Sequence, residues 1–528
     1  MKKLPIGLQT LEDLRKRNGI YVDKTEHIYK MVTEAGKFFF LSRPRRFGKS
    51  LLISTFKELF KGSKQLFEGL YIYDKWVWSK KYPIIHLDFS EIEYETVEQL
   101  KDSLEKFLDD TAIRENITLD KTETRLINAK FAELIEKLHE STGQQVVVLI
   151  DEYDKPIIDN IIDKQVYDKV KRILHNFYQV IKGNDTHLKF VFMTGVSRFS
   201  GVSIFSGLNN LNDITVDERY SAICGYTQKE LEMNFKDYIL LLSKKLDLKY
   251  EKIIALIKEW YNGYSWDGEM SVYNPFSTLM LFDKNIFENY WFRTGTPTFL
   301  IELLKKNNQL TGIFEPIVVD DIASNSYDGG DIDTIDLLFQ TGYLTIKERK
   351  IYLGVPEYTL NVANFEVKDS LVRYLLNAYS NYPLKELKGL QTTVHQQLQD
   401  LDGEGLSESI GKLFVNIPYP LHIGKEAYWH SLFLLAMNAL GFDFKGEILT
   451  NKGRLDAVWK GKDFVVVCEI KYSVKKTIIK MLEEALKQIE DKKYYEAYSS
   501  KKVVLLGIAF NGKDVKCKFG KLYSKNKS

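Results

Sequence analysis

The chain has 528 residues, of which 44% are apolar and 28% are charged, and its formal net charge is +2. With 31 Phe, 31 Tyr and 7 Trp it has ample material for a packed core, which excludes a wholly disordered protein. Its three cysteines, Cys224, Cys468 and Cys517, lie far apart, which excludes a disulfide framework and favours a reducing, cytoplasmic setting.

The N-terminal residues 1–8 contain two lysines but no apolar stretch of signal-peptide length, so no secretory signal is expected. The longest near-apolar run, residues 431–442, is shorter than the roughly 20 residues that a membrane-spanning helix needs. No membrane partner is therefore predicted.

Short apolar runs alternate with helical stretches over residues 1–224. Four runs indicate buried strands, because Val, Ile or Phe fills consecutive positions as in a parallel sheet covered on both faces. They are residues 37–42, 83–89, 145–150 and 188–194. Helical periodicity lies between them, for example at residues 130–140. This alternation predicts a doubly wound α/β domain.

A Gly-Lys-Ser sequence follows the first of these strands and precedes a helix at residues 51–60. That order is the setting of a phosphate-binding loop, in which free N–H groups at the helix start meet phosphate. We expect Lys49 to reach the β- and γ-phosphates of ATP and Ser50 to ligate Mg²⁺. Arg43 stands where the standard motif has glycine, which leaves a basic turn before a helix as the alternative. Further candidate nucleotide contacts are Arg46, Phe47, Gly48 and Leu51.

Acidic residues end the third predicted strand. A hydrophobic strand that delivers Asp and Glu at its carboxyl end is typical of sites that hold Mg²⁺ and orient water for ATP hydrolysis. We expect Asp151 to hold the metal and Glu152 to polarise the water; a simple turn is the alternative. Thr194 and Arg198 follow the fourth strand and are candidates for sensing the γ-phosphate, against an ordinary strand end with a surface arginine.

Beyond about Gly225 the pattern becomes helical, and a hairpin-like pair follows at residues 342–347 and 350–353. These features predict a lid domain over residues 225–375. The acidic, Gly-containing stretch 400–405 is expected to be a linker.

A C-terminal domain is predicted over residues 376–528. Its expected elements are a helix at 426–440, strands at 443–449, 454–459 and 464–471, a helix at 478–490 and a strand at 502–510. The lysine-rich tail 511–528 is expected to be a solvated end.

Three charged residues stand at fixed spacing in this domain. Glu469 and Lys471 are two residues apart on a strand, so their side chains share one face. A turn between the two strands would bring Asp456 beside Glu469. Two close carboxylates repel unless a cation lies between them, so Mg²⁺, or alternatively Mn²⁺, is expected there with the Ile470 carbonyl as a third ligand. Lys471 would stabilise charge on a phosphodiester. A chance hairpin with solvated charges is the alternative.

Together these motifs resemble a bacterial AAA-ATPase-like family often fused to a C-terminal PD-(D/E)XK nuclease superfamily domain. The segments that carry the likeness are residues 4–7, 21–25, 42–50, 149–154 and 194–199, and in the C-terminal domain 426–431, 446–447, 453–456, 464–471, 485–489 and 494–495. The resemblance implies ATP binding by an ASCE-type P-loop fold, a helical or winged-helix-like lid and an α/β/α nuclease domain. It also implies that Glu426 assists the metal from its helix and that Gln488 lines the nuclease site.

We therefore expect a protein that binds and hydrolyses ATP, and whose ATP state gates metal-dependent hydrolysis of nucleic acid. DNA is favoured over RNA as the partner, and a homo-oligomer formed through the ATPase domain is a further expectation. The alternatives are a regulatory switch whose nuclease-like domain only binds nucleic acid or protein, and an ATPase in which that domain is purely architectural.

Overall fold

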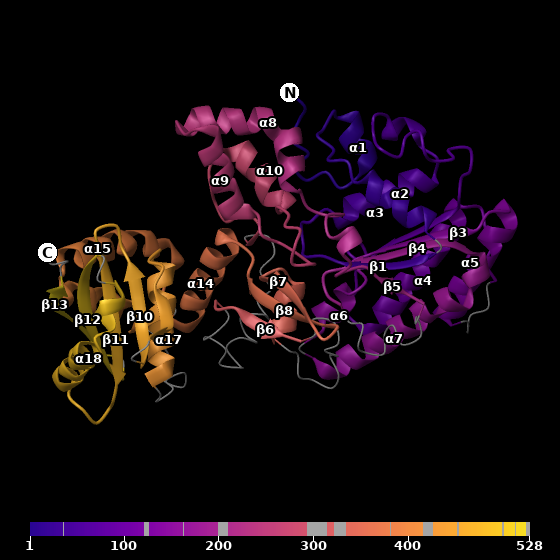
Figure 1. Cartoon of the computed structure of the whole chain (residues 1–528). Coiled ribbons are helices and arrows are strands. Elements are labelled where there is room, and N and C mark those ends of the chain that lie inside the picture. The colour runs from indigo at the N-terminus through magenta and orange to yellow at the C-terminus, as the bar shows by residue number, and fades with distance from the viewer. Residues whose placement is uncertain are drawn as a thin grey trace. The chain divides into compact units, whose positions relative to one another are not determined.

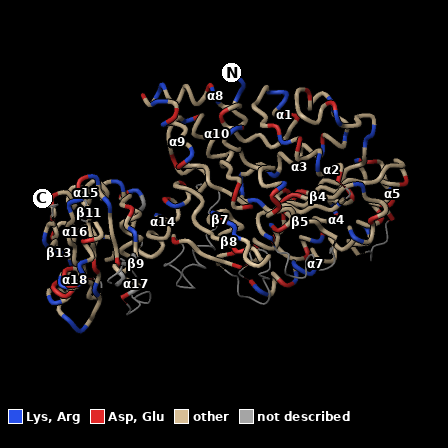
Figure 2. The backbone as a smooth tube through the Cα atoms, in the orientation of Figure 1, with Lys and Arg blue, Asp and Glu red and all other residues tan. Residues whose placement is uncertain are grey.

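The computed structural model (Figure 1) describes residues 1–34, 36–120, 126–161, 163–198, 210–292, 314–320, 334–380, 382–415, 426–450, 453–498, 501–512 and 514–523. The chain divides into two compact units. The first comprises Met1–Gly295 and Phe314–Glu366, and the second comprises Thr296–Ile313 and Val367–Ser528. Lysine and arginine are interspersed with aspartate and glutamate along both units (Figure 2).

A five-stranded parallel sheet forms the centre of the first unit, in the order β2-β3-β4-β1-β5. The strands are β1 (Phe38–Ser42), β2 (Ile84–Asp88), β3 (Val146–Asp151), β4 (Leu188–Gly195) and β5 (Asn212–Asp213). The predicted parallel sheet and its first four strands are thus confirmed. Strand β4 lies between β1, which leads into the Gly-Lys-Ser loop, and β3, which ends in the acidic residues. This strand order is the one expected for an ASCE-type P-loop fold.

Helices cover both faces of this sheet. On one face, Phe56 and Phe60 of α3 (Lys49–Phe60) pack against Phe190 and Phe192 of β4. On the other face, one core joins the strands to α4 (Val97–Arg114), α5 (Ile127–Thr142) and α7 (Lys164–Gly183). Every residue of β1 and β3 is buried, as expected for strands covered on both faces. The remaining helices of this part are α1 (Leu11–Lys16), α2 (Thr25–Thr33) and α6 (Lys155–Asp159).

The predicted lid consists of helices followed by a small antiparallel sheet of order β6-β8-β7. Its described elements are α8 (Gln228–Leu246), α9 (Tyr250–Tyr261), α10 (Pro275–Lys284), β6 (Ile317–Val319), α13 (Thr334–Gln340), β7 (Leu344–Tyr352) and β8 (Val355–Val362). The predicted hairpin is wrong in its turn. Residues 344–352 form one strand, and the chain reverses at Leu353 and Gly354.

The second unit is built on a five-stranded mixed sheet of order β13-β12-β11-β10-β9. The strands are β9 (Lys445–Thr450), β10 (Gly453–Lys460), β11 (Phe464–Tyr472), β12 (Lys502–Asn511) and β13 (Asp514–Tyr523). On β12, Leu505 belongs to the core shared with α18 (Ile478–Lys492), whereas Phe510 packs against Phe414 and Trp429. These two rings come from α16 (Gly403–Phe414) and α17 (Glu426–Ala439), so the predicted α/β/α layering is confirmed. The helices α14 (Phe365–Ser380) and α15 (Leu387–Asp400) precede them.

Two expectations for this unit are wrong. Residues 400–405 are not a linker, because α16 begins at Gly403 with Asp402 as its N-cap. The tail is not wholly solvated either, since Asp514–Tyr523 pairs with β12 as β13. Ser407 of α16 accepts a hydrogen bond of 2.8 Å from the backbone N–H of Cys517, and a side chain at Gly403 would meet the Cys517 carbonyl at 2.8 Å. Helix and strand are therefore packed together.

Candidate functional sites

The phosphate-loop motif joins β1 to α3 as predicted. Gly48 is the N-cap of α3 and has a left-handed φ of 90°, and Arg46 has a φ of 67°. The left-handed turns thus fall at positions 46 and 48. Arg43 has no positive φ, so its position does not require the glycine of the standard motif.

Arg43 is fully buried and points into the protein. Its guanidinium donates hydrogen bonds to the carbonyls of Ser42 (2.8 Å), Thr215 (2.8 Å) and Tyr220 (3.2 Å), and lies 3.9 Å from the centre of the Trp266 ring. Burial lowers the pKa of Arg43 to about 10, so it remains charged at neutral pH. Arg43 therefore fixes the shape of the loop and does not face a phosphate.

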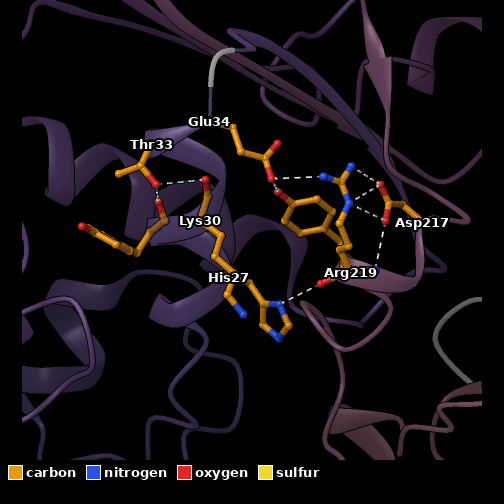
Figure 3. Close-up of polar contacts among 8 residues, drawn as sticks. His27, Lys30, Thr33, Glu34, Asp217 and Arg219 are labelled. Carbon is orange, nitrogen blue, oxygen red and sulfur yellow. Dashed lines mark hydrogen bonds and ion pairs between the residues drawn. The ribbon is translucent and has the colours of Figure 1, made fainter.

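The segment that receives Arg43 is tied to α2 (Figure 3). The Tyr220 hydroxyl donates to Glu34 (2.8 Å), and Arg219 forms ion pairs with Glu34 (3.2 Å) and Asp217 (2.6 Å). One nitrogen of His27 lies 3.2 Å from the Arg219 carbonyl oxygen. These contacts hold the 3-10 turn Glu218–Tyr220, and with it one of the three carbonyls that bind Arg43.

A cavity of about 480 Å³ lies beside the loop, which is a size suited to a small-molecule ligand. Its walls come from the loop, from the acidic turn after β3, from the N-terminal segment and from the lid. Of the predicted nucleotide contacts, those that line it are Arg46, Phe47, Gly48, Lys49, Ser50, Leu51 and Glu152. Asp151, Thr194 and Arg198 lie outside the lining.

The carboxylates of the acidic turn after β3 act electrostatically on Lys49. Its ammonium donates to the carbonyls of Arg43 (2.9 Å) and Pro44 (3.1 Å). Burial lowers the pKa of Lys49, and the negative charges of Asp151 and Glu152 oppose this shift. Burial also raises the pKa of Asp151 to about 6, while Lys49 and a hydrogen bond from Ser50 hold it down. The structure thus brings Lys49, Ser50 and Asp151 together.

Glu152 has a left-handed φ of 50°, an uncommon conformation for a glutamate. This strain lies in the wall of the cavity, and local strain is concentrated at functional positions.

The ends of β3 and β4 are joined by the buried carboxylate of Asp154. It accepts hydrogen bonds from the N–H groups of Val196 (3.0 Å) and Ser197. Burial raises the pKa of Asp154 to about 6. Beside it, the Thr194 hydroxyl is buried and has no hydrogen-bond partner among the described residues. Arg198 is engaged elsewhere, in an ion pair with Asp213 and through its N–H to the Gln340 side chain (2.8 Å).

Several cavity residues were not predicted. Lys24 is buried and contacts both carboxylate oxygens of Glu230 at 2.7 Å. Asp88 lines the cavity at the end of β2, and the reasoning applied to β3 could have found it. Tyr226 and Phe276 come from the lid, and their aromatic side chains line the cavity. No local sequence signal distinguishes these two rings from core aromatics.

In the second unit the hairpin of β10 and β11 has the predicted register. Ala457 is opposite Cys468, which places Asp456 opposite Glu469. Asp456 accepts a hydrogen bond from the N–H of Ile470 (2.8 Å), and the Lys471 ammonium lies 3.0 Å from Glu469 Oε1.

The two residues implied by the resemblance also lie at this site. Gln488 of α18 donates a hydrogen bond to Glu469 Oε1. Glu426 of α17 accepts from the N–H of Tyr472 (3.3 Å), and its other oxygen lies 3.9 Å from the Lys471 ammonium. Asp456, Glu469, Lys471, Glu426 and Gln488 are therefore brought together from four elements.

Glu469 is 1% exposed, and burial together with Asp456 raises its pKa to about 7, against the opposing effect of Lys471. Its Oε2 atom has no hydrogen-bond partner among the described residues. An unpaired buried carboxylate oxygen is costly, so this atom fits a bound cation. The available donors are all oxygens, which suits Mg²⁺ or Mn²⁺. Within the described ranges, however, no cluster of three or more His, Cys, Asp or Glu side chains forms a ready-made metal site.

Two unpredicted contacts support this site. His430 of α17 has one ring nitrogen 2.7 Å from the Asp456 carbonyl oxygen. Tyr494 is buried and hydrogen-bonded to Gln488. Glu447 and Arg454, which belong to segments that carry the family resemblance, have side chains outside the described part of the chain.

The chain is similar to known proteins over most of its length. The family described as "Predicted AAA-ATPase" matches residues 5–205, and the family described as "PD-(D/E)XK nuclease superfamily" matches residues 424–519. A protein of Azotobacter chroococcum mcd 1, named "Uncharacterized protein in vnfD 5'region", is 39% identical over 524 residues, which covers 97% of this chain and 96% of that protein. No solved structure matches. Among the described helices, none is both long and apolar enough to cross a bilayer.

Proposed function

The chain belongs to the predicted AAA-ATPase family and carries a C-terminal PD-(D/E)XK nuclease superfamily domain, and from this premise we propose that it hydrolyses ATP and cleaves nucleic acid in a metal-dependent reaction. We assign residues 1–224 to the ATPase domain, 225–375 to the lid and 376–528 to the nuclease-like domain. The proposed setting is the cytoplasm, where ATP and Mg²⁺ are available.

The proposed ATP site uses the loop and the acidic turn. The ammonium of Lys49 would exchange the carbonyls of Arg43 and Pro44 for phosphate oxygens. Ser50 and Asp151 would hold Mg²⁺, which supplies positive charge to the phosphates when bound. Glu152 would orient and polarise the attacking water from the cavity wall. Thr194 and Arg198 remain candidates for sensing the γ-phosphate from between the two strand ends.

The proposed nuclease site uses Asp456, Glu469 and the Ile470 carbonyl to hold Mg²⁺ or Mn²⁺. Gln488 positions Glu469 through its hydrogen bond, and Glu426 assists from α17. Lys471 would stabilise the negative charge that builds on the phosphodiester. The observation that carries the proposal is the unpaired, buried Oε2 of Glu469, because it gives the carboxylate pair a reason to bind a cation.

We further propose that the ATP state gates cleavage, that DNA is the preferred partner, and that the chain can form a homo-oligomer through its ATPase domain. The gating is motivated by the presence of both sites in one chain. A second candidate function is a switch that binds ATP and only binds nucleic acid or protein through the nuclease-like domain. The ion pair between Lys471 and Glu469 (3.0 Å) favours this candidate, because it offsets the charge of the buried carboxylate without a metal.

A cleavage assay distinguishes the nuclease from the switch. Full-length protein is incubated with labelled DNA or RNA and with Mg²⁺ or Mn²⁺, in the presence and absence of ATP. We expect Lys49→Ala to lower ATP turnover by about 100-fold or more, and Asp456→Asn to lower cleavage by a similar factor. Matched controls are Lys61→Ala at the end of α3 and Asp463→Asn in the turn after β10, which should leave both activities unchanged.

The outcomes separate the claims. Cleavage that is equal with and without ATP, and equal in Lys49→Ala, removes the gating. Nucleic-acid binding without cleavage, unchanged by Asp456→Asn, supports the switch instead of the nuclease.

A further inference from the structure

The turn between β7 and β8 exposes large apolar side chains. Leu353 is 87% exposed and Tyr352 is 74% exposed, and Ile351 and Val355 are also exposed. We call residues 351–355 the hairpin tip. Lone exposed apolar residues are ordinary, but four clustered at one turn indicate a surface that contacts something.

The backbone of the tip adds a second, independent observation. Leu353 and Gly354 form a two-residue turn, and both have positive φ, 50° and 83°. This geometry favours Asn-Gly or Asp-Gly, and leucine is disfavoured in it. Leu353 therefore adopts a disfavoured backbone conformation and also leaves its side chain in solvent. No packing of this side chain against the described residues compensates for the strain.

The tip is apolar on both faces of the hairpin. Tyr352 is opposite Val355 on one face, and Ile351 is opposite Pro356 on the other. A patch that docks on a protein surface needs only one apolar face. A thin blade with two apolar faces suits insertion between two flat apolar surfaces, such as neighbouring bases.

The hairpin is packed at its base, and two basic residues lie behind the apolar tip. A side chain at Gly268 would meet the backbone of Arg349 at 2.9 Å, so β7 is packed tightly up to that residue. From Arg349 to Leu353 the strand extends about 13 Å, at roughly 3.3 Å per residue. Arg349 and Lys350 lie directly behind the apolar residues and form ion pairs with Glu218 (3.9 Å) and Glu348 (3.0 Å). Both carboxylates are exposed, and exposed ion pairs are weak, so the two cations can exchange them for the phosphates that flank an unstacked step.

We propose that the hairpin tip inserts between bases of DNA and unstacks them, as a wedge that presents the strand to the protein. The inference rests on the proposed function, since it takes nucleic acid as the partner of this chain. The wedge itself lies wholly in the first unit and involves none of the proposed ATP or nuclease residues.

The test uses the full chain in EDTA, which prevents cleavage, with duplex and forked DNA that contain 2-aminopurine. Wild-type protein should raise the fluorescence as the probe base unstacks. Leu353→Asn creates the preferred Asn-Gly turn, so its melting temperature should equal or exceed that of wild type. We expect it to lose the fluorescence rise and to bind about tenfold more weakly. Tyr352→Thr, which suits a strand, should behave likewise, and Val77→Asn at another exposed apolar position should behave as wild type.

Wild-type affinity and fluorescence in both tip variants would overturn the wedge and leave the proposed function standing. Wild-type protein that binds no nucleic acid would overturn both. Sedimentation velocity on the same samples gives a third outcome. If Leu353→Asn alone converts an oligomer to a monomer with DNA binding intact, the partner of the tip is a second copy of the chain and the wedge is wrong.

Discussion

Glu366 is a buried carboxylate that none of the proposed reactions uses. It accepts hydrogen bonds from Ser277 (3.1 Å) and from the N–H of Trp291 (2.7 Å), whose ring nitrogen donates to the Arg45 carbonyl of the phosphate loop (3.0 Å). Burial raises the pKa of Glu366 from 4.5 to about 8, although both hydrogen bonds oppose this. The folded protein therefore keeps a proton here at neutral pH, whereas the unfolded chain has lost it.

Protonation of Glu366 should make the stability of the folded protein fall as the pH rises. The folded state holds the extra proton between pH 4.5 and about 8, so this residue makes the protein less stable as the pH rises through that range. The slope is at most about 1.4 kcal/mol per pH unit. Glu366→Gln mimics the protonated form and should flatten the fall in unfolding free energy between pH 5 and 8, measured by urea titration. Glu259→Gln, at an exposed site of α9, should keep the wild-type slope; an unchanged slope in Glu366→Gln would contradict the assignment.

At the scale of elements, the phosphate loop is packed against the turn between α13 and β7. Gly342 has a φ of 89°, and a side chain there would meet Pro44 of the loop at 2.6 Å. Gly342→Ala should displace the loop and raise the KM for ATP about tenfold or more. The matched control is Gly143→Ala, which has a similarly left-handed φ of 64° but open space around it. It should lose some stability and keep its KM; equal KM values in the two variants would show that Pro44 simply moves aside.

Strands β1 to β4 could be predicted because their apolar residues are consecutive, as full burial demands. The two-residue β5 could not, since polar Asn212 and Asp213 join the sheet only by pairing with Phe39 and Phe40. Strand β13 was missed because its lysines suggested solvent. Yet Val515 and Cys517 are buried between them, and this alternation was visible in the sequence.

The candidate sites could be predicted where spacing along one element decides the geometry, as for Glu469 and Lys471. The role of Arg43 could not, because its carbonyl partners lie 172 and 177 residues away at Thr215 and Tyr220. Likewise Lys24 finds Glu230 at a separation of 206 residues. Such pairs are created by the tertiary fold.

At the scale of the whole molecule, the gating proposal makes a prediction about amide hydrogen exchange. Binding stabilises the state that binds, by about 2.7 kcal/mol at a ligand concentration of 100 times Kd. Mg·ATP should therefore slow exchange in β1 and α3, and gating requires that exchange also change in β11 and α18 of the second unit. Lys49→Ala should show neither effect. Protection confined to the first unit would mean that the two sites work independently.

The buried guanidinium of Arg43 also limits which residues the loop accepts at this position. Replacing it with glycine would restore the common motif but strip three interior carbonyls of their donor and leave empty space under the Trp266 ring. Arg43→Gly would therefore weaken the fold of this protein even though it restores the common motif.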